Sequence, residues 1–321
     1  MAVRSKKREP KGSGVKGLLM LEWVVLGYLL LTLLLMLFTY TRVHNPQAML
    51  WGRVQIVAMT LALWGVYRMV PCRLTMLARV LAQLCLLGWW YPDTYEFNRM
   101  FPNLDHVFAT WEQQLFGYQP ALTFAQNWPS AWVSEPLCLG YFSYYPMIGL
   151  VCLFYFVRRY DRFLRTSFII LASFFLFYVV FIFLPVAGPQ YYYQAVGLDQ
   201  IAQGVFPSLG HYFETHQECL PIPGYEGGFF HQLVAQAHEA GERPTAAFPS
   251  SHVGVTTILL WLAWSSRNRL LFWLLVPLAV LMFFATFYIQ AHYAIDAIAG
   301  LFVGTFFYFL LGFVYDRAGR Q

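Results

Sequence analysis

Long apolar runs alternate with polar segments along most of the chain. Reading each apolar stretch of about 20 residues as a membrane-spanning helix predicts eight spans, at roughly 17–38, 50–69, 73–91, 135–157, 164–186, 250–266, 268–289 and 294–315. Two spans are weaker than the others, because Arg79 interrupts the third and the sixth is short. The pattern therefore predicts an all-α integral membrane protein with about eight transmembrane helices.

The two longest polar segments divide the chain into parts. We expect a basic tail (1–16), N-terminal transmembrane helices (17–91), an outer interfacial segment (92–134), a transmembrane core (135–315) and a short tail (316–321). Mixed apolar and charged residues around Trp111 are typical of a helix in the headgroup layer. Residues 187–249, which we call the lid loop, are rich in Gly, Pro, Tyr and His and show no sustained period. A long loop of this kind inside a compact core is usually functional.

Composition supports the membrane assignment, and the placement of charges indicates the orientation of the chain in the membrane. The chain is 59% hydrophobic and 12% charged, whereas an average soluble domain is about 25% charged. With the N-terminus inside, only Arg42, Arg53, Arg99 and Arg243 of the 21 Lys and Arg fall on outer segments, which leaves 17 on inner ones. Because cations prefer the cytoplasmic side, both termini are expected in the cytoplasm. The net charge of +5 thus reports orientation and does not imply nucleic acid.

The N-terminus resembles a targeting segment, since a basic stretch precedes an apolar run. The run is too long for a cleaved signal peptide and no small-residue cleavage site follows it, which predicts an uncleaved signal anchor. We therefore expect an integral protein of a bacterial inner membrane or a secretory-pathway membrane. Four of the five cysteines lie in or beside spans and only Cys219 lies in an outer loop, so no disulfide framework is indicated.

Two histidines carry the candidate chemistry. His252 ends the motif Pro249-Ser250-Ser251-His252, and His292 opens His292-Tyr293-Ala294-Ile295-Asp296. The predicted orientation places both at the outer, periplasmic or lumenal side. A neutral imidazole can attack phosphorus, and a second can protonate the departing oxygen. Asp296 lies four residues after His292, which on one helix face would let it hold the attacking ring in one tautomer.

An anion site is expected next to these histidines. Pro249 before an apolar run indicates a helix start, so free N–H groups near Ser250 and Ser251 and the helix dipole favour a phosphate there. Gln190, in the segment that ends the fifth span, converges on the same layer. Arg243 is the outer arginine near these motifs and could bind phosphate bidentately. The serines could also merely cap the helix, and Arg243 could be a solvated loop charge.

These motifs resemble those of the type 2 phosphatidic acid phosphatase superfamily. The resemblance rests on Pro-Ser-Ser-His and His-x-x-x-Asp in this order on neighbouring spans, and it covers roughly residues 135–315. It implies a six-helix core with His292 as a phosphohistidine nucleophile. It further implies that Asp296 orients this nucleophile and that His252 is the acid for the leaving group.

Departures from the usual pattern point to one branch of that superfamily. Thr286 occupies the place of an expected arginine, and Pro185 to Gln190 replaces the first motif. Ala285-Thr286 with His292-Tyr293-x-x-Asp296 is similar to fungal inositol phosphorylceramide synthases and their bacterial relatives, and the second motif also resembles that of sphingomyelin synthases. Relatives often carry Arg where this chain has Gln190. The resemblance implies transfer of a phosphorylated headgroup, inositol phosphate-like, to a lipid alcohol such as ceramide.

Other readings stay open beside this one. A lipid phosphate phosphatase, of the phosphatidate or polyprenyl pyrophosphate type, would use the same residues. A transporter or scaffold is a third reading, although the middle of the spans lacks the charges of an ion pathway. We expect a phospholipid or sphingolipid substrate and no cofactor. No metal is expected either, since His211, His216 and Cys219 lack a fourth zinc ligand.

Two further groups of residues have more than one reading. Tyr144, Tyr145 and the run Tyr191 to Tyr193 could line a sugar or inositol pocket, or could form an aromatic belt. Gly300 and Gly304 have the spacing of a helix-packing motif. They could join two chains or pack within the bundle.

Overall fold

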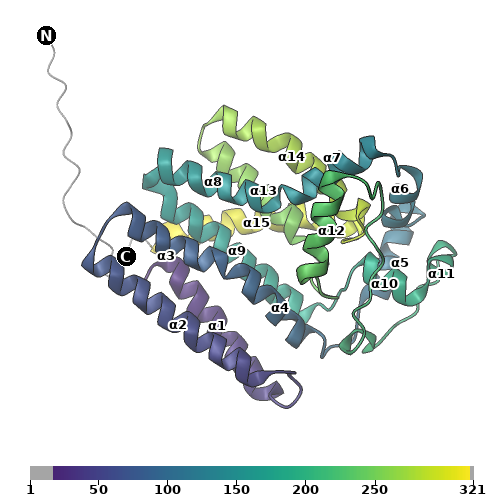
Figure 1. Ribbon diagram of the computed structural model, residues 1–321, viewed down its shortest axis with the longest axis horizontal. Helices are drawn as coiled ribbons and strands as arrows, with labels where there is room; N and C mark the ends of the chain where they lie inside the picture. The colour runs from purple at the N-terminus through teal and green to yellow at the C-terminus, as the bar shows by residue number, and fades with distance from the viewer. Residues whose placement is uncertain (1–16, 319–321) are drawn as a thin grey trace, which may run out of the picture.

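The computed structural model describes residues 17–318, and these form helices and no strand (Figure 1). The predicted basic tail 1–16 and residues 319–321 of the predicted C-terminal tail lie outside the described residues. The longer helices run side by side as a bundle, and shorter helices gather at one end of it. The prediction of an all-α protein is therefore confirmed for the part of the chain that the structure describes.

Four helices form the N-terminal part of the bundle. They are α1 (Met20–Thr39), α2 (Pro46–Met69), α3 (Arg73–Cys85) and α4 (Leu87–Asn98). Helix α2 starts four residues before the predicted span, because Pro46 occupies its first turn and the Asn45 side chain accepts a hydrogen bond from the Ala48 N–H at 3.1 Å. Helices α1, α3 and α4 pack against α9 (Phe163–Phe183), the most deeply buried of the spans.

The remaining long helices surround α13 (Ser251–Ser265). This helix packs against α8 (Tyr144–Arg158), α9, α14 (Arg269–Tyr288) and α15 (Ala294–Ala318). Helix α7 (Ala131–Phe142) packs against α14 and leads into α8 through a bend of 46°. The start of α13 is thus held at the centre of the bundle, near the ends of its neighbours.

The short helices belong to the two predicted outer segments. The interfacial segment contains α5 (Asp105–Phe116) and α6 (Pro120–Asn127). The lid loop contains α10 (Pro189–Val196), α11 (Leu198–Ala202), the 3₁₀ turn η2 (Tyr212–Glu214) and α12 (Phe229–Gly241); a second 3₁₀ turn, η1 (Tyr160–Arg162), precedes α9. Figure 1 shows α5, α6, α10, α11 and α12 gathered at the same end of the bundle.

Among the described residues, six helical segments are long and apolar enough to cross a membrane. They are Met20–Thr39, Pro46–Met69, Arg73–Asn98, Tyr160–Phe183, Arg269–Tyr288 and Ala294–Ala318, with a seventh if the bent pair α7 and α8 is one span. The predicted sixth span corresponds to α13, which has 15 residues and at about 1.5 Å per residue is shorter than the hydrocarbon layer of about 30 Å. These helices fit an integral membrane protein, and the count of eight stays a prediction.

Candidate active site

His292 lies in the turn between α14 and α15 and is almost fully buried. Its Nδ1 is 2.7 Å from the carbonyl oxygen of Ala247. A carbonyl only accepts, so Nδ1 must carry the proton that it donates. The Nε2 atom of His292 therefore holds a free lone pair, which is the state that a nucleophile requires.

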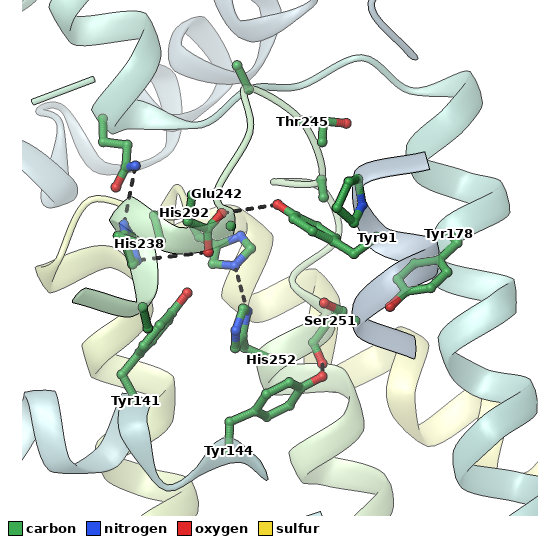
Figure 2. A pocket seen from close by; sticks show the side chains of 18 of the residues that line it. Tyr91, Tyr141, Tyr144, Tyr178, His238, Glu242, Thr245, Ser251, His252 and His292 are labelled. Carbon is green, nitrogen blue, oxygen red and sulfur yellow. Dashed lines mark hydrogen bonds and ion pairs between the residues drawn. The ribbon is translucent and has the colours of Figure 1, made fainter. Parts of the chain in front are cut away.

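His252 lies in the first turn of α13 and faces that lone pair. Its Nδ1 is 3.4 Å from Nε2 of His292, and the two ring centroids are 5.6 Å apart. The His252 ring stacks on Tyr141 at 4.6 Å and contacts Tyr144 at 4.5 Å (Figure 2). The structure thus brings together the two histidines that the sequence singled out, 40 residues apart in the chain.

Close packing of α13 on α15 sets this approach. The N–H of Ser250 donates to the carbonyl oxygen of Asp296 at 3.0 Å, which ties the starts of the two helices together. A Cβ atom on Gly300 would lie 2.6 Å from the Ser250 carbonyl oxygen, and one on Gly304 would overlap the carbonyl of Gly254. Gly300 and Gly304 therefore pack within the bundle, as one of the two readings of the sequence expected.

Asp296 lies beside His292 without a direct hydrogen bond to its ring. The distance from Asp296 Oδ2 to His292 Nδ1 is 3.8 Å, which is too long for a hydrogen bond. Oδ2 instead accepts the Tyr293 N–H at 2.8 Å, while Oδ1 has no partner among the described residues. The contact that fixes the tautomer of His292 in this structure is the Ala247 carbonyl. Asp296 shapes the turn that presents the ring.

Burial determines the charge of His292. Loss of solvent lowers the pKa of His292 to about 4, although the hydrogen bond to Ala247 and the nearby Glu242 carboxylate act in the opposite direction. Desolvation disfavours the charged form of an imidazole. The ring is therefore neutral at pH 7, with Nε2 available for attack.

Both histidines open into a cavity of about 350 Å³. Its wall is largely aromatic and includes Tyr91, Tyr141, Tyr144, Tyr145, Phe174, Tyr178 and Tyr191. Among the described residues no Lys or Arg lines this cavity. A cavity of this size can hold a phosphorylated headgroup, but it offers no guanidinium to clamp the phosphate.

The predicted phosphate-binding residues fall into two groups. Ser251 and Gln190 line the cavity, and the Gln190 Oε1 atom is buried without a partner among the described residues. Ser250 is fully buried and caps α13 by accepting the Val253 N–H at 3.4 Å. Arg243 does not line the cavity, and its guanidinium donates to the backbone oxygen of Glu242 at 2.9 Å.

Three polar lining residues of the lid loop were not singled out from the sequence. His238 belongs to α12, and Glu242 and Thr245 follow that helix in the lid loop. Figure 2 shows Glu242 between His238 and Tyr91, close to His292. The sequence analysis found no sustained period in this segment, although the structure forms α12 there, so no pattern marked these positions. The i, i+4 spacing of His238 and Glu242 was the one signal that could have drawn attention to them.

Two buried carboxylates of α5 hold the loops that carry the site. Asp105 accepts the N–H groups of Ala187 and Gly188 at 2.6 and 2.8 Å, and the Tyr293 hydroxyl at 3.0 Å. Glu112 accepts the Ala294 N–H at 2.6 Å, and burial raises the pKa of its carboxyl to about 8. The predicted interfacial segment therefore also supports the turn that presents His292.

The remaining candidates of the sequence separate in the structure. Tyr144, Tyr145 and Tyr191 line the cavity, whereas the hydroxyls of Tyr192 and Tyr193 bond to Pro207 and Gln119 outside it. Among residues 17–318, no three or more His, Cys, Asp or Glu side chains are arranged to hold a metal ion. All five cysteines are free.

Comparison with known proteins gives one match. The model of a family described as the PAP2 superfamily matches residues 106–310. That range contains α5, the lid loop and both histidine motifs. No curated protein and no solved structure matches the chain.

Proposed function

The chain belongs to the PAP2 superfamily, and on that premise we propose that it is a lipid phosphotransferase that works through a phosphohistidine intermediate. Membership in the superfamily suggests a lipid phosphatase or phosphotransferase activity. The observation that carries the finer proposal is the orientation of His292. Its Nδ1 is occupied by the Ala247 carbonyl and its Nε2 faces His252 in a cavity.

In the first proposed step, Nε2 of His292 attacks the phosphorus of a phospholipid in line. The bond from phosphorus to the leaving lipid oxygen breaks as the nitrogen–phosphorus bond forms. His252, in its protonated imidazolium form, gives one proton to that oxygen and becomes neutral, so the lipid leaves as a neutral alcohol. The phosphorylated headgroup then remains on His292.

In the second proposed step, the hydroxyl of an acceptor attacks the phosphohistidine. His252, which lost its proton in the first step, now takes the proton of the acceptor. The nitrogen–phosphorus bond breaks and His292 returns to its neutral state with Nδ1 still bonded to Ala247. A lipid alcohol such as ceramide gives headgroup transfer, and water gives hydrolysis.

The phosphoryl oxygens need donors in both steps. We assign this role to Ser251, to Gln190 and to the first N–H groups of α13, which have no partners inside the helix. Ser250 fixes that helix start as its cap, and Asp296 fixes the turn of His292. Arg243 would have to leave its contact with the Glu242 backbone to reach a phosphate.

We further propose, from the charge pattern, that the site faces the periplasm or the lumen. Arg42 and Arg99, two of the four predicted outer cations, lie near Glu214 of the lid loop, at 4.0 and 3.9 Å. Arg159 and Arg162 donate to the backbone at Ser266 and Ser265, where α13 ends. Outer and inner cations thus lie at opposite ends of α13, which supports a periplasmic or lumenal site with both termini in the cytoplasm.

The test separates transfer from hydrolysis. The purified protein is incubated with a phospholipid labelled in its headgroup phosphate and with increasing ceramide in mixed micelles. We expect a labelled ceramide product that grows with ceramide, and a labelled protein when the acceptor is omitted. Release of labelled headgroup phosphate at every ceramide concentration would identify a lipid phosphatase instead. Failure to cleave any lipid phosphate would contradict both activities.

A further inference from the structure

The charges around the catalytic cavity are unusual for a phosphate-binding site. Such sites are commonly neutralised by Arg or Lys, yet none lines this cavity in the described part of the chain. The one acidic side chain in the lining is Glu242. Apart from the proton that His252 carries in the proposed first step, a bound phosphate would therefore meet a carboxylate and no permanent cation.

One oxygen of Glu242 is available to a ligand. Oε2 accepts the Tyr91 hydroxyl at 3.0 Å. Oε1 has His238 Nε2 as its nearest recorded polar neighbour, at 3.9 Å, which exceeds a hydrogen bond. Figure 2 shows this carboxyl group inside the cavity, close to His292. A group between Glu242 and His292 would contact the free oxygen.

His238 does not supply the missing positive charge. Its Nδ1 lies 3.4 Å from Nε2 of Gln190, an amide nitrogen that can only donate, so Nδ1 accepts and Nε2 carries the proton. The His238 side chain is 8% exposed, and burial lowers its pKa. His238 is therefore a neutral donor, and Thr245 offers a second neutral group whose hydroxyl has no partner among the described residues.

The aromatic wall is suited to a cation. The rings of Tyr91, Tyr141, Tyr144, Tyr145, Tyr178 and Tyr191 surround the same space as Glu242. Aromatic faces attract ammonium groups electrostatically, and more strongly where water is excluded. Tyrosine rings beside a single carboxylate are a common arrangement for an ammonium ligand.

We propose that this cavity takes a zwitterionic headgroup, in which a phosphate and an ammonium group belong to one ligand. The ammonium lies against Glu242 and the tyrosine rings, and the phosphate lies at His292. The ligand then brings the cation that the cavity lacks, and the occupied site has no excess of like charge. An inositol phosphate would place a second negative charge beside Glu242 without compensation. The inference rests on the proposed function for its reaction, but its ligand preference does not depend on turnover.

The first experiment compares donors in the wild-type protein. Phosphatidylcholine and phosphatidylinositol with matched acyl chains are supplied with the same ceramide acceptor, and kcat/KM is measured for each. We expect phosphatidylcholine to be preferred by about tenfold or more. Equal use of the two lipids, or a preference for phosphatidylinositol, would overturn the inference and leave the proposed phosphotransfer intact.

The second experiment changes the carboxylate alone. Glu242→Gln keeps an acceptor for the Tyr91 hydroxyl and removes the charge. We expect kcat/KM for phosphatidylcholine to fall by roughly ten- to a hundredfold, with a much smaller loss for phosphatidylinositol. Glu239→Gln is the matched control, since Glu239 is exposed on α12, the helix that Glu242 follows, and does not line the cavity. Equal losses for the two lipids would assign Glu242 a structural role and reject the inference.

The third measurement needs no turnover. Soluble phosphocholine and inositol 1-phosphate are titrated into the wild-type protein and the Glu242→Gln variant, and binding is followed by the shift in thermal unfolding. Phosphocholine should stabilise the wild type at lower concentration than inositol 1-phosphate, and the difference should vanish in the variant. Binding of this kind without cleavage of any lipid would reject the proposed function alone. Stronger binding of inositol 1-phosphate would reject the headgroup inference.

Discussion

Charged side chains are handled in opposite ways in the N-terminal helices, where they are buried, and in the cavity of the candidate site, where Glu242 is 26% exposed. In the N-terminal part, Arg79 of α3 binds Glu22 of α1 at 2.5 Å, and Arg53 of α2 binds Asp93 of α4 at 2.6 Å. In the cavity, the Glu242 carboxylate accepts a hydrogen bond from Tyr91, and no cationic side chain of the described residues pairs with it, since the neutral His238 lies 3.9 Å away. The paired charges link helices to one another, whereas the carboxylate of the cavity keeps one oxygen open.

The difference follows from the cost of burying charge in a bilayer protein. An ionised side chain away from water is expensive unless an opposite charge and hydrogen bonds compensate it. Glu22 and Arg79 are both fully buried and meet that condition through two contacts. Glu242 is partly exposed, so water compensates its charge until a ligand takes the place of that water. Paired groups should therefore control stability, and the groups of the cavity should control activity.

The largest effect should come from removing His292, the proposed nucleophile. His292→Ala should lower turnover by roughly a million-fold, because no other lining group holds a lone pair in its place, while thermal unfolding in detergent changes much less. His252→Ala should cost roughly a hundred- to ten-thousandfold, as expected for a lost acid or base. Headgroup transfer is measured for both, with His216→Ala on an exposed position as the control. Appreciable activity in His292→Ala would exclude the covalent mechanism.

The second effect concerns stability and should leave the site intact. Glu22→Gln strands the buried Arg79 charge and should lower the free energy of unfolding by about 3 to 5 kcal/mol. Thermal unfolding of the purified protein in detergent measures the change, and Glu226→Gln, at an exposed position, serves as control. The double variant Glu22→Gln with Arg79→Met should recover much of the loss. No recovery would show that the arginine contributes more than its charge.

The smallest effect is a displaced pH profile. Burial lowers the pKa of His292 to about 4, compared with about 6.5 for an exposed histidine. Only the neutral ring can attack, so activity should persist as the pH falls below 6.5 and should be lost near pH 4. A phosphodiester donor does not titrate in this range, so kcat/KM between pH 4 and 8 reports the enzyme. If activity is lost on acidification with a midpoint at pH 6.5 or above, His292 is solvated and the expected pKa is wrong.

The sequence was sufficient to predict those parts of the molecule that show a hydrophobic period or a short motif. The apolar runs located the long helices, and the spacing within two short motifs identified His252, His292 and Asp296. The carboxylates of Asp105 and Glu112 were not predicted as supports, because their partners are backbone N–H groups of distant loops. Nothing in the sequence predicts such contacts. His238 and Glu242 were missed because α12, which contains His238 and precedes Glu242, lies in a segment that the sequence analysis interpreted as a loop.

Two expectations changed for reasons of geometry. Arg243 was the outer arginine nearest the motifs in the chain, but the backbone after α12 directs it to the Glu242 carbonyl and away from the cavity lining. The tautomer of His292 was expected to depend on Asp296. The folded turn uses that carboxylate for the Tyr293 N–H and gives the ring the Ala247 carbonyl. The i, i+4 spacing predicts that Asp296 lies near His292, but it does not predict which N–H group the carboxylate accepts.

The glycine contacts between α13 and α15 have a consequence for the membrane around the protein. Where Gly300 and Gly304 meet Ser250 and Gly254, backbone touches backbone and no side chain remains to be compressed. A thicker or thinner bilayer is accommodated by tilting helices and by deforming the lipid. Helix contacts made by flexible side chains change during such tilting before contacts between backbones do. The separation of the two imidazoles is instead set at a rigid crossing point. The reaction should therefore tolerate changes of acyl chain length and lateral pressure that alter how the outer helices sit in the lipid.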